Sequence, residues 1–473
     1  MIKIITLSAI IICLEFLSGE ARIINIPADY ATIQTGIDAS INGDTVLVAP
    51  GTYFENINFG TNDILLCSRF LFDGDTTDIG MTIIDGDSTN TVAYFPPSEN
   101  LGRLEGFTIR HGRAQICGGG IYVRGRHAII RNNIITNNIV TGFGWLGGGI
   151  AITENSNCLV DHNWITNNRG GTGGGIYCGS AVATIEENII QNNEARFSGE
   201  DGWGGGGIYC SSSAAVISGN LFLGNSADIG GGGIKTYSDI FVINNVLFDN
   251  IARDENEGGG AVDILYTHAS IANCILWNNG GNEIHAWSSQ PTVIYNDIQG
   301  GFAGEGNIDT YPLFRDTSIA DFYLMSIACG DSADSPCIDA GIPDSLDQIL
   351  DCLHGLGTTR SDMGAYGGNN SSQLTGIHDY SNSRIPDIIT LSQNYPNPFN
   401  GSTTINYFLA KAADVRINIF DILGRKIETL SEGFQSIGSH RLIWNGDSRP
   451  SGIYFYRIQA GNFVETKKML LVK

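Results

Sequence analysis

Charged residues are scarce in this chain of 473 residues, at 16% of the total, while the hydrophobic fraction is an ordinary 42%. That balance excludes a disordered polyelectrolyte and leaves enough apolar material for a core. Lysine is almost missing between residues 22 and 387, where Lys235 is the single example. The same stretch holds 15 basic and 41 acidic residues. Nucleic-acid binding needs basic stripes, so nucleic acid is not expected as a partner.

Several motifs that would identify an enzyme are also missing. The sequence has no Cys/His cluster with zinc spacing, no EF-hand loop, and neither a GxSxG nor an HExxH motif. Their absence weakens the case for serine-hydrolase or zinc-protease chemistry. Metal therefore does not explain the cysteines, whereas export to an oxidising compartment does.

Long apolar runs are missing after the first residues. The start, MIKIITLSAIIICLEFLSGEARI, has one Lys, an apolar run from Ile4 to Leu14, and then the small residues Gly19 and Ala21. This pattern predicts a signal peptide over residues 1–21, and no transmembrane span is expected after its removal. Nine cysteines then remain, of which Cys329, Cys337 and Cys352 lie close enough in sequence to pair.

Glycine, in contrast, is abundant and periodic. A phrase of the type GGGIYC begins at Gly118, Gly147, Gly173, Gly205, Gly231 and Gly258, with spacings of 29, 26, 32, 26 and 27 residues. Each copy is followed by a second phrase such as IIRNNIITNN or LVDHNWITNN. Self-similarity at this period indicates a repeat architecture.

The type of repeat follows from the pattern within each copy. Apolar residues alternate in two or three short β-type runs, and no run has a helical period. Such a unit must stack on copies of itself, which predicts a right-handed parallel β-helix with one repeat per coil. One set of isoleucines should form an inward ladder: Ile121, Ile150, Ile176, Ile208 and Ile234. One set of asparagines should form a ladder at a bend: Asn133, Asn163, Asn188, Asn220 and Asn245.

Two details complete the predicted solenoid. The glycine triplets are expected to permit tight turns with positive φ before each inward strand. Tyr30, Ile33, Ile37 and Ile41 lie on one helical stripe, which predicts a helix that caps the N-terminal end.

Three sequence stretches resemble known families. The opening IPADYATIQTGIDASINGDTVLVAPGTYFENI resembles secreted pectin-lyase-like β-helix proteins, and NIDTYPLF, DSPCIDAG and RSDMGAYGG are similar to the close of bacterial surface β-helix proteins. LSQNYPNPFNGSTTINYFL, IFDILGRKI and the terminal KKMLLVK resemble the type A C-terminal sorting domain of type IX secretion, with Gly401 in place of the usual Pro. The resemblance implies export across the outer membrane, then surface attachment or release.

The resulting domain prediction is an all-β chain. A β-helix passenger with its cap should cover residues 22–366, a linker residues 367–387, and a small β-sandwich sorting domain residues 388–473. Residues 388–473 hold ten Lys/Arg and six Asp/Glu, so the charge changes sign at this boundary. The partner implied for the sorting domain is the type IX secretion machinery.

Two groups of residues are candidates for catalysis. Aligned on the ladder asparagines, one column reads Arg131, Asp161, Glu186, and the next reads Asn132, His162, Glu187. Carboxylates stacked about 4.8 Å apart could raise one pKa, as an acid/base pair requires, although a surface charge ladder would show the same pattern.

The second group follows from the position after the inward isoleucines. Lys235 shares that outward column with Tyr122, Tyr177 and Tyr209, so Tyr209 and Lys235 could be a base and its assistant. The alternative is an aromatic ladder that ends in a lysine. Tyr122 and Tyr177 are also candidates for ligand binding.

The long loops form a third candidate site. Trp145 and Trp203 lie in corresponding insertions and could offer flat platforms to sugar rings, or could pin their own loops. Acidic residues of these loops are candidates for calcium: Glu200, Asp201, Asp254, Glu255 and Glu257. The acidic composition permits calcium as a cofactor, and the sequence establishes no other.

Our interpretation from sequence is a secreted or cell-surface β-helix protein that binds or structures extracellular material, with a glycan favoured over other partners and no catalysis. The GGGI and FxxN phrases, as in Phe222–Asn225, resemble the repeats of outer-membrane adhesins. Two alternatives stay open: a polysaccharide lyase or glycosidase of the pectin-lyase-like type, and a stiff spacer without a ligand. A strongly acidic passenger disfavours a polyuronate unless a cation bridges the two.

Overall fold

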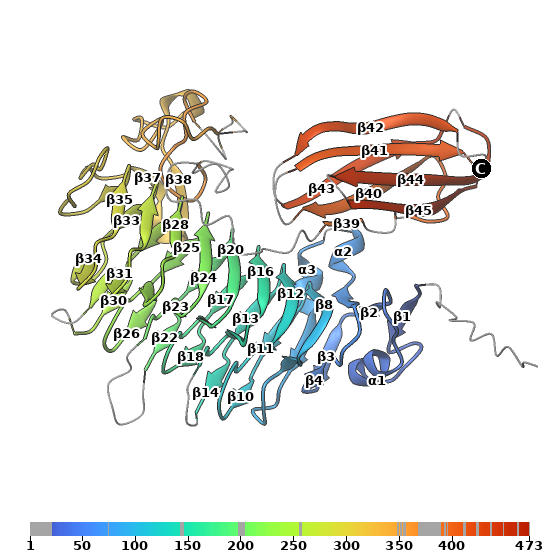
Figure 1. Ribbon diagram of the computed structural model, residues 1–473, viewed down its shortest axis with the longest axis horizontal. Helices are drawn as coiled ribbons and strands as arrows, with labels where there is room; N and C mark the ends of the chain where they lie inside the picture. The colour runs from blue at the N-terminus through green and yellow to red at the C-terminus, as the bar shows by residue number, and fades with distance from the viewer. Residues whose placement is uncertain are drawn as a thin grey trace, which may run out of the picture.

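The computed structural model describes residues 21–73, 75–141, 146–196, 204–254, 258–347, 350, 352 and 356–367, and then 389–472 with short gaps. The predicted signal peptide therefore lies outside the described residues, apart from Ala21, and so does the predicted linker, apart from Gly367. Residues 23–298 form a parallel β-solenoid, as predicted from the repeats (Figure 1). Each coil passes in turn through sheets that we name C, A, B and D.

Sheets A and B are the longest of the solenoid, and all their strands pair in parallel. Sheet A contains, in spatial order, β1 (Ile23–Ile26), β2 (Thr45–Val48), β5 (Ile64–Ser68), β8 (Ser98–Glu105), β12 (Arg126–Arg131), β16 (Asn157–Asp161), β20 (Val182–Glu186), β24 (Ala214–Ser218), β28 (Phe241–Ile243), β32 (Ser270–Ala272) and β35 (Thr292–Ile294). Sheet B contains β3 (Gly51–Phe54), β6 (Thr82–Asp85), β9 (Thr108–Arg110), β13 (Ile134–Thr136), β17 (Trp164–Thr166), β21 (Ile189–Gln191), β25 (Leu221–Leu223), β29 (Val246–Phe248), β33 (Ile275–Trp277) and β36 (Asp297–Ile298).

Sheets C and D complete each coil, and the glycine triplets lead into the strands of sheet C. Sheet C contains β34 (Asn282–Trp287), β31 (Gly259–Leu265), β27 (Ile234–Thr236), β23 (Ile208–Ser211), β19 (Ile176–Gly179), β15 (Ile150–Thr153), β11 (Ile121–Arg124), β7 (Ala93–Phe95) and β4 (Ile57–Asn58). Sheet D contains β10 (Arg113–Ala114), β14 (Ile139–Val140), β18 (Arg169–Gly170), β22 (Glu194–Ala195), β26 (Ser226–Ala227) and β30 (Ile251–Ala252).

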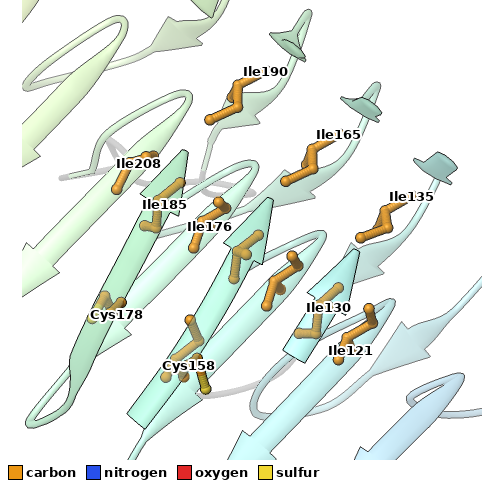
Figure 2. Close-up of a cluster of buried hydrophobic side chains, with 14 of the residues drawn as sticks. Ile121, Ile130, Ile135, Cys158, Ile165, Ile176, Cys178, Ile185, Ile190 and Ile208 are labelled. Atoms are coloured by element: carbon orange, nitrogen blue, oxygen red, sulfur yellow. The ribbon is translucent and has the colours of Figure 1, made fainter. Parts of the chain in front are cut away.

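The predicted isoleucine ladder is confirmed. Ile121, Ile150, Ile176, Ile208 and Ile234 are direct partners on successive strands of sheet C, and all are fully buried. Figure 2 shows side chains from sheets A, B and C, among them Ile130, Ile135 and Cys178, that fill the interior between the strands. The solenoid core is therefore a stack of apolar layers, one per coil.

The predicted asparagine ladder is confirmed too, and it lies at the bend between sheets A and B. The Asn163 amide donates to the carbonyl oxygens of Ile130 and Asp161 at 2.8 and 3.0 Å, and to Asn188 Oδ1 at 3.0 Å. A second ladder follows sheet B, and its members are Asn138, Asn168, Asn193, Asn225, Asn250 and Asn279. Both ladders satisfy backbone groups that the bends would otherwise leave unpaired inside the protein.

The main physical reason for glycine in the triplets differs from the one expected. Positive φ occurs at Gly118, Gly147 and Gly173, but not at Gly205 or Gly231. The middle glycine of each triplet instead faces the backbone of the next coil. A Cβ at Gly174 would lie 2.5 Å from the carbonyl oxygen of Gly206. Close backbone approach thus requires glycine at every coil, whereas a left-handed turn requires it at some.

Gly174→Ala is accordingly expected to lower the free energy of unfolding by about 1–3 kcal/mol, because the added methyl group forces two coils apart. Urea or thermal unfolding of the purified variant measures the effect. Gly80→Ala is the matched control, since a Cβ there meets nothing within 4 Å. Equal stability of the two variants would contradict the packing argument.

The N-terminal cap is shorter than predicted. The helix α1 spans Ile33–Asp38, and Thr32 caps its first turn by accepting a hydrogen bond from the Thr35 amide. Ile33 and Ile37 are buried as expected, but Ile41 lies beyond the end of the helix and is 42% exposed. Two further short helices, α2 (Phe70–Asp73) and α3 (Thr77–Met81), lie between β5 and β6.

After the solenoid, the chain folds back over sheet B. This segment contains β37 (Phe314–Asp316), η1 (Thr317–Ile319), β38 (Asp321–Leu324) and η2 (Ile327–Cys329). Its apolar side chains pack on Leu221, Val246 and Ile275, which point outward from sheet B. A disulfide joins Cys329 to Cys352, two of the three cysteines expected to pair. The third, Cys337, is buried with a free thiol.

The C-terminal region forms two antiparallel sheets around one apolar core, as predicted for a small sandwich. One sheet contains β39 (Ile389–Leu391), β40 (Ser402–Leu409) and β43 (Gly438–Asn445). The other contains β42 (Lys426–Gln435), β41 (Ala413–Asp421), β44 (Gly452–Ala460) and β45 (Phe463–Leu471). Trp444, Tyr407 and Tyr456 are its largest buried side chains.

Candidate functional site

A column of charged side chains follows the ends of the strands in sheet A. Glu105, Arg131, Asp161 and Glu186 are direct partners on β8, β12, β16 and β20. The register therefore agrees with the alignment made on the ladder asparagines. The environment differs from a surface ladder, because Arg131 and Glu186 are each 8% exposed and Asp161 is 1% exposed. Arg131 Nε donates to Asp161 Oδ2 at 2.7 Å.

His162 lies beside this column at the bend and has a positive φ of 55°. Its Nδ1 is 3.1 Å from Asp161 Oδ2, and its Nε2 is 2.7 Å from Glu187 Oε2. About half of the His162 and Glu187 side chains is exposed. Both ring nitrogens are thus occupied by carboxylates, an arrangement that fits a charged imidazolium clamp between two coils.

The pKa values of these groups move apart for identifiable reasons. Burial raises the pKa of Glu186 to about 8, and the charges of Asp161 and Glu187 act in the same direction. Burial would also raise the pKa of Asp161, but the Arg131 guanidinium and the hydrogen bond with His162 outweigh it and hold that pKa below its usual value. Burial would lower the pKa of His162, yet the hydrogen bonds to both carboxylates raise it to about 10.

A pH dependence of stability follows from Glu186. Its pKa is higher in the folded chain than in the unfolded chain, so folding takes up a proton between about pH 4.5 and 8 and stability falls as the pH rises through that window. Glu186→Gln removes this contribution. The variant should gain melting temperature relative to the wild type from pH 5 to pH 8, and the difference should level off above. A constant difference at all pH values would contradict the assignment.

The pKa values of Asp161 and Glu186 are shifted apart, as in an acid/base pair, but a substrate has poor access to these side chains. Asp161 is buried and already binds Arg131 and His162. Neither nitrogen of His162 is free to exchange a proton with a substrate while both carboxylates hold it. In this arrangement the charged column binds adjacent coils to each other. The geometry gives no argument for catalysis by the four predicted residues, which remain candidates only: Asp161, His162, Glu186 and Glu187.

The outer face of sheet C carries the second candidate group. Tyr209 and Lys235 are direct partners on β23 and β27, as the repeat alignment indicates. Lys235 is 1% exposed, and its Nζ lies 3.1 Å from Asp263 Oδ2. The lysine is therefore part of a buried ion pair, an environment that the sequence alone did not indicate.

Asp263 is the centre of a three-residue cluster that sequence reasoning missed. It is 0% exposed, and its second oxygen lies 2.7 Å from His285 Nδ1 on β34. The miss has a structural cause, because Gly258 lies opposite Gly230 and not opposite Gly231, so the glycine phrase of this coil is offset by one residue from that of the coil before it. Val262, not Ala261, then occupies the inward position next to Ile234, and Asp263 becomes the partner of Lys235. An alignment on the glycine triplets cannot detect that shift.

Aromatic rings form a row on the same face. Tyr122 and Tyr177 lie on β11 and β19, with the small Ala151 between them in register. The row extends past Tyr209 through residues that the sequence analysis did not single out: Tyr237, Tyr266 and Trp287. The signal for them is an aromatic residue at the end of, or directly after, each of the last three strands of sheet C, β27, β31 and β34.

The loop residues fall mostly outside the described part of the chain. This applies to Trp145 and Trp203 and to the calcium candidates Glu200, Asp201, Glu255 and Glu257. Asp254 is described, partly buried, and its amide donates to the carbonyl oxygen of Asp228. Among the described residues, no group of three or more His, Cys, Asp or Glu side chains is arranged to hold a metal ion.

Comparisons with known proteins identify two regions. Residues 79–247 match the family model of the right handed beta helix region, and residues 393–473 match that of the secretion system C-terminal sorting domain. No curated protein and no solved structure matches the chain. No helix in the described part of the chain is long and apolar enough to cross a membrane. The sorting domain indicates that the protein is secreted through the type IX machinery, with surface attachment or release.

Proposed function

We propose that this exported β-helix protein binds an extended neutral glycan along the outer face of sheet C. The observation that carries the proposal is the aromatic row on that face. Its members, which we call the sheet C row, are Tyr94, Tyr122, Tyr177, Tyr209, Tyr237, Tyr266 and Trp287. Aromatic faces are apolar platforms on which the C–H faces of sugar rings can pack.

The spacing of the row suits a linear polymer. Ring centroids of Tyr177 and Tyr209 are 5.6 Å apart with planes 11° from parallel, and those of Tyr209 and Tyr237 are 6.0 Å apart. Tyr237 and Tyr266 follow at 6.4 Å. Since successive coils rise by about 4.8 Å, the rings repeat along the axis of the solenoid. A chain of sugars extended along this axis could place successive rings over successive tyrosines.

The row is held in place by its surroundings. The Tyr177 ring lies over Gly179, where a side chain would collide with the Tyr177 hydroxyl group. Tyr122 Oη accepts a hydrogen bond from Thr153 on the next coil at 3.4 Å. The other five members of the row are partly buried, whereas Tyr266 and Trp287 are 67% and 58% exposed. Rings that are already ordered lose little conformational entropy when a ligand binds.

Charge supports a neutral ligand. The chain has a formal net charge of −23, and the acidic residues concentrate before the sorting domain. A polyanion such as a polyuronate would be repelled unless a cation bridged the two surfaces. Trp145 and Trp203 lie outside the described residues, each five residues before the first residue of a sheet C strand in the sequence, and remain candidates for additional contacts.

The alternatives make different predictions. The split pKa values of Asp161 and Glu186 are the one observation that favours a glycosidase, and turnover abolished by Glu186→Gln would identify it. A lyase that uses Tyr209 and Lys235 would release unsaturated products and lose activity in Lys235→Ala. A spacer would show neither turnover nor binding.

Retention on immobilised polysaccharides tests the proposal. The mature chain should be retained on at least one neutral glycan among glucomannan, xylan, β-1,3-glucan and starch, with polygalacturonate and alginate as acidic comparators. Tyr177→Ala combined with Tyr209→Ala should weaken retention at least tenfold, since two stacking contacts of about 1 kcal/mol each are lost. Tyr311→Ala, at an exposed tyrosine away from the row, is the matched control. Equal loss in both variants would overturn the assignment to sheet C.

A further inference from the structure

The column of sheet C that contains Tyr177 and Tyr209 ends in the cluster of Lys235, Asp263 and His285, beside Tyr237, Tyr266 and Trp287 of the sheet C row. The three residues of the cluster are direct partners on β27, β31 and β34 and continue that column. Asp263 Oδ1 faces His285 Nδ1 at 2.7 Å, and Asp263 Oδ2 faces Lys235 Nζ at 3.1 Å. A glycan that follows the row past Tyr266 would therefore reach His285.

The cluster has one polar atom available to a ligand. Lys235 and Asp263 are 1% and 0% exposed, so they lie beneath the surface. The His285 side chain is 20% exposed and belongs to the last strand of sheet C, where no further strand of the described solenoid pairs with it. Within the described residues, His285 Nε2 has no hydrogen-bond partner. His162 differs, because both of its nitrogens bind carboxylates.

Other ionisable groups near the cluster have partners of their own. Glu283, on the same strand, accepts hydrogen bonds from the backbone and side chain of Asn279 at 3.1 and 2.6 Å. Asp239 accepts from the backbone of His268 at 2.7 Å, and His268 Nδ1 is 4.0 Å from the same carboxylate. Asp263 is thus the group that orients His285 through Nδ1, which leaves Nε2 without a partner among the described residues.

We propose that His285 is a general base that hydrolyses O-acyl esters, such as acetyl groups, on the glycan that lies on the sheet C row. The proposal rests on the function proposed above and adds a reaction to it. Asp263 and Lys235 are positioning residues: Asp263 holds the imidazole, and Lys235 compensates the buried charge of Asp263. His285 is the catalytic residue, since it faces the reacting atoms.

The reaction balances without a cofactor. His285 Nε2 takes a proton from a water molecule, and the water oxygen bonds to the carbonyl carbon of the ester. The tetrahedral intermediate then collapses, the bond from that carbon to the sugar oxygen breaks, and the imidazolium returns the proton to the sugar oxygen. The products are acetic acid and a free hydroxyl group on the glycan. Histidine as a lone base typically contributes 10²–10⁴-fold, so turnover should be slow.

This cluster fits ester hydrolysis better than the other reactions of polysaccharides. Hydrolysis of a glycosidic bond uses two carboxyl groups on opposite sides of that bond, and Asp263 is enclosed by Lys235 and His285. Elimination removes a proton next to a uronate carboxylate, and the acidic chain disfavours such a ligand. Ester hydrolysis needs one base and a water molecule, which the imidazole of a partly exposed histidine can activate.

The first experiment measures acetate released from O-acetylated glucomannan by the mature chain. The wild type should release acetate, and His285→Gln should lower the rate about 10²-fold while retention on glucomannan stays unchanged. His268→Gln, at a histidine that is 72% exposed nearby, is the matched control and should keep the wild-type rate. Retention without acetate release by the wild type would overturn the base but leave glycan binding intact. Absence of wild-type retention on every one of the four neutral glycans would overturn the proposed function.

A second measurement needs no substrate. Diethyl pyrocarbonate acylates a histidine nitrogen that has a free lone pair, and peptide mass spectrometry gives the rate at each site. His285 should react at least tenfold faster than His162. In Asp263→Asn the rate at His285 per folded molecule should change, because the imidazole loses its fixed orientation. Equal rates at His285 and His162, or an unchanged rate in Asp263→Asn, would overturn the proposed arrangement.

Discussion

Asn188→Ala is expected to lower the free energy of unfolding by about 3–5 kcal/mol, as much as the loss of a large core side chain. Asn188 lies in the middle of the ladder between sheets A and B and is 1% exposed. Its amide donates to the carbonyl oxygens of Val160 and Glu186 and to Asn220 Oδ1, at 2.8, 2.9 and 3.0 Å. Its own Oδ1 accepts from the backbone and side chain of Asn163.

The large loss of stability in Asn188→Ala comes from the buried polar groups that lose their hydrogen-bond partner. Each hydrogen bond contributes about 1 kcal/mol, but a buried carbonyl or amide that loses its partner also has its desolvation cost uncompensated. Alanine leaves several such groups at once, in a bend that excludes water. The chain itself contains a milder replacement, because Cys274 occupies the ladder position after Asn245 and its Sγ accepts from the Asn245 backbone N–H at 3.4 Å.

Chemical unfolding followed by circular dichroism measures the loss, with melting temperature as a second readout. Asn192→Gly is the matched control: Asn192 is exposed with a positive φ of 52°, and Gly224 occupies the corresponding position one coil later. The control should be neutral or slightly stabilising. If Asn188→Ala were no more destabilising than Asn192→Gly, the ladder would not be what closes this bend.

Asp263→Asn is expected to lower the free energy of unfolding by about 3–5 kcal/mol, because it leaves the Lys235 ammonium buried without its counter-charge. Lys235→Met alone should cost a similar amount for the reverse reason. The double variant, Lys235→Met with Asp263→Asn, should recover most of the stability, since no uncompensated charge remains. Such strong non-additivity is the signature of two residues that interact directly.

A surface ion pair gives the comparison. Arg253 Nη1 lies 2.6 Å from Asp228 Oδ1, with the arginine side chain 43% exposed. Arg253→Ala should cost less than about 1 kcal/mol, because solvent screens the pair. The test is to measure unfolding curves at one pH for the two single variants at Lys235 and Asp263, for their double variant and for Arg253→Ala. Additive losses at Lys235 and Asp263 would mean that their charges are solvated and that the cluster is not buried.

The sequence predicted the solenoid coil, but only part of how neighbouring coils and the segment after the solenoid bury its outer side chains. Strict repeats fixed the inward isoleucines and the ladder asparagines, and with them the register of Arg131, Asp161 and Glu186. The burial of that column depends on how neighbouring coils cover each other, which no single repeat reveals. The cover over sheet B did leave a signal: LFL at Leu221–Leu223 is apolar at outward positions, where earlier coils have IIT and IIQ.

The cluster around Asp263 shows a different limit. The glycine phrase of this coil is offset by one residue from that of the coil before it, and a slip of one residue exchanges the two faces of a strand. Lys235 was recognised as unusual because it is the one lysine between residues 22 and 387, yet its partners were not recognised. Repeat alignments are thus most reliable where coils have equal length and least reliable at irregular coils, where the candidate chemistry lies.

The most direct test of the account is to locate the ligand on the surface. Hydroxyl-radical footprinting of the mature chain, read by peptide mass spectrometry, should be carried out with and without the best-retained neutral glycan. We expect protection of Tyr177, Tyr209, Tyr237 and Tyr266 together, with the exposed Tyr311 unchanged. Protection that avoids sheet C, for example at Trp164 on the exposed face of sheet B, would contradict the claim that the row is the binding surface.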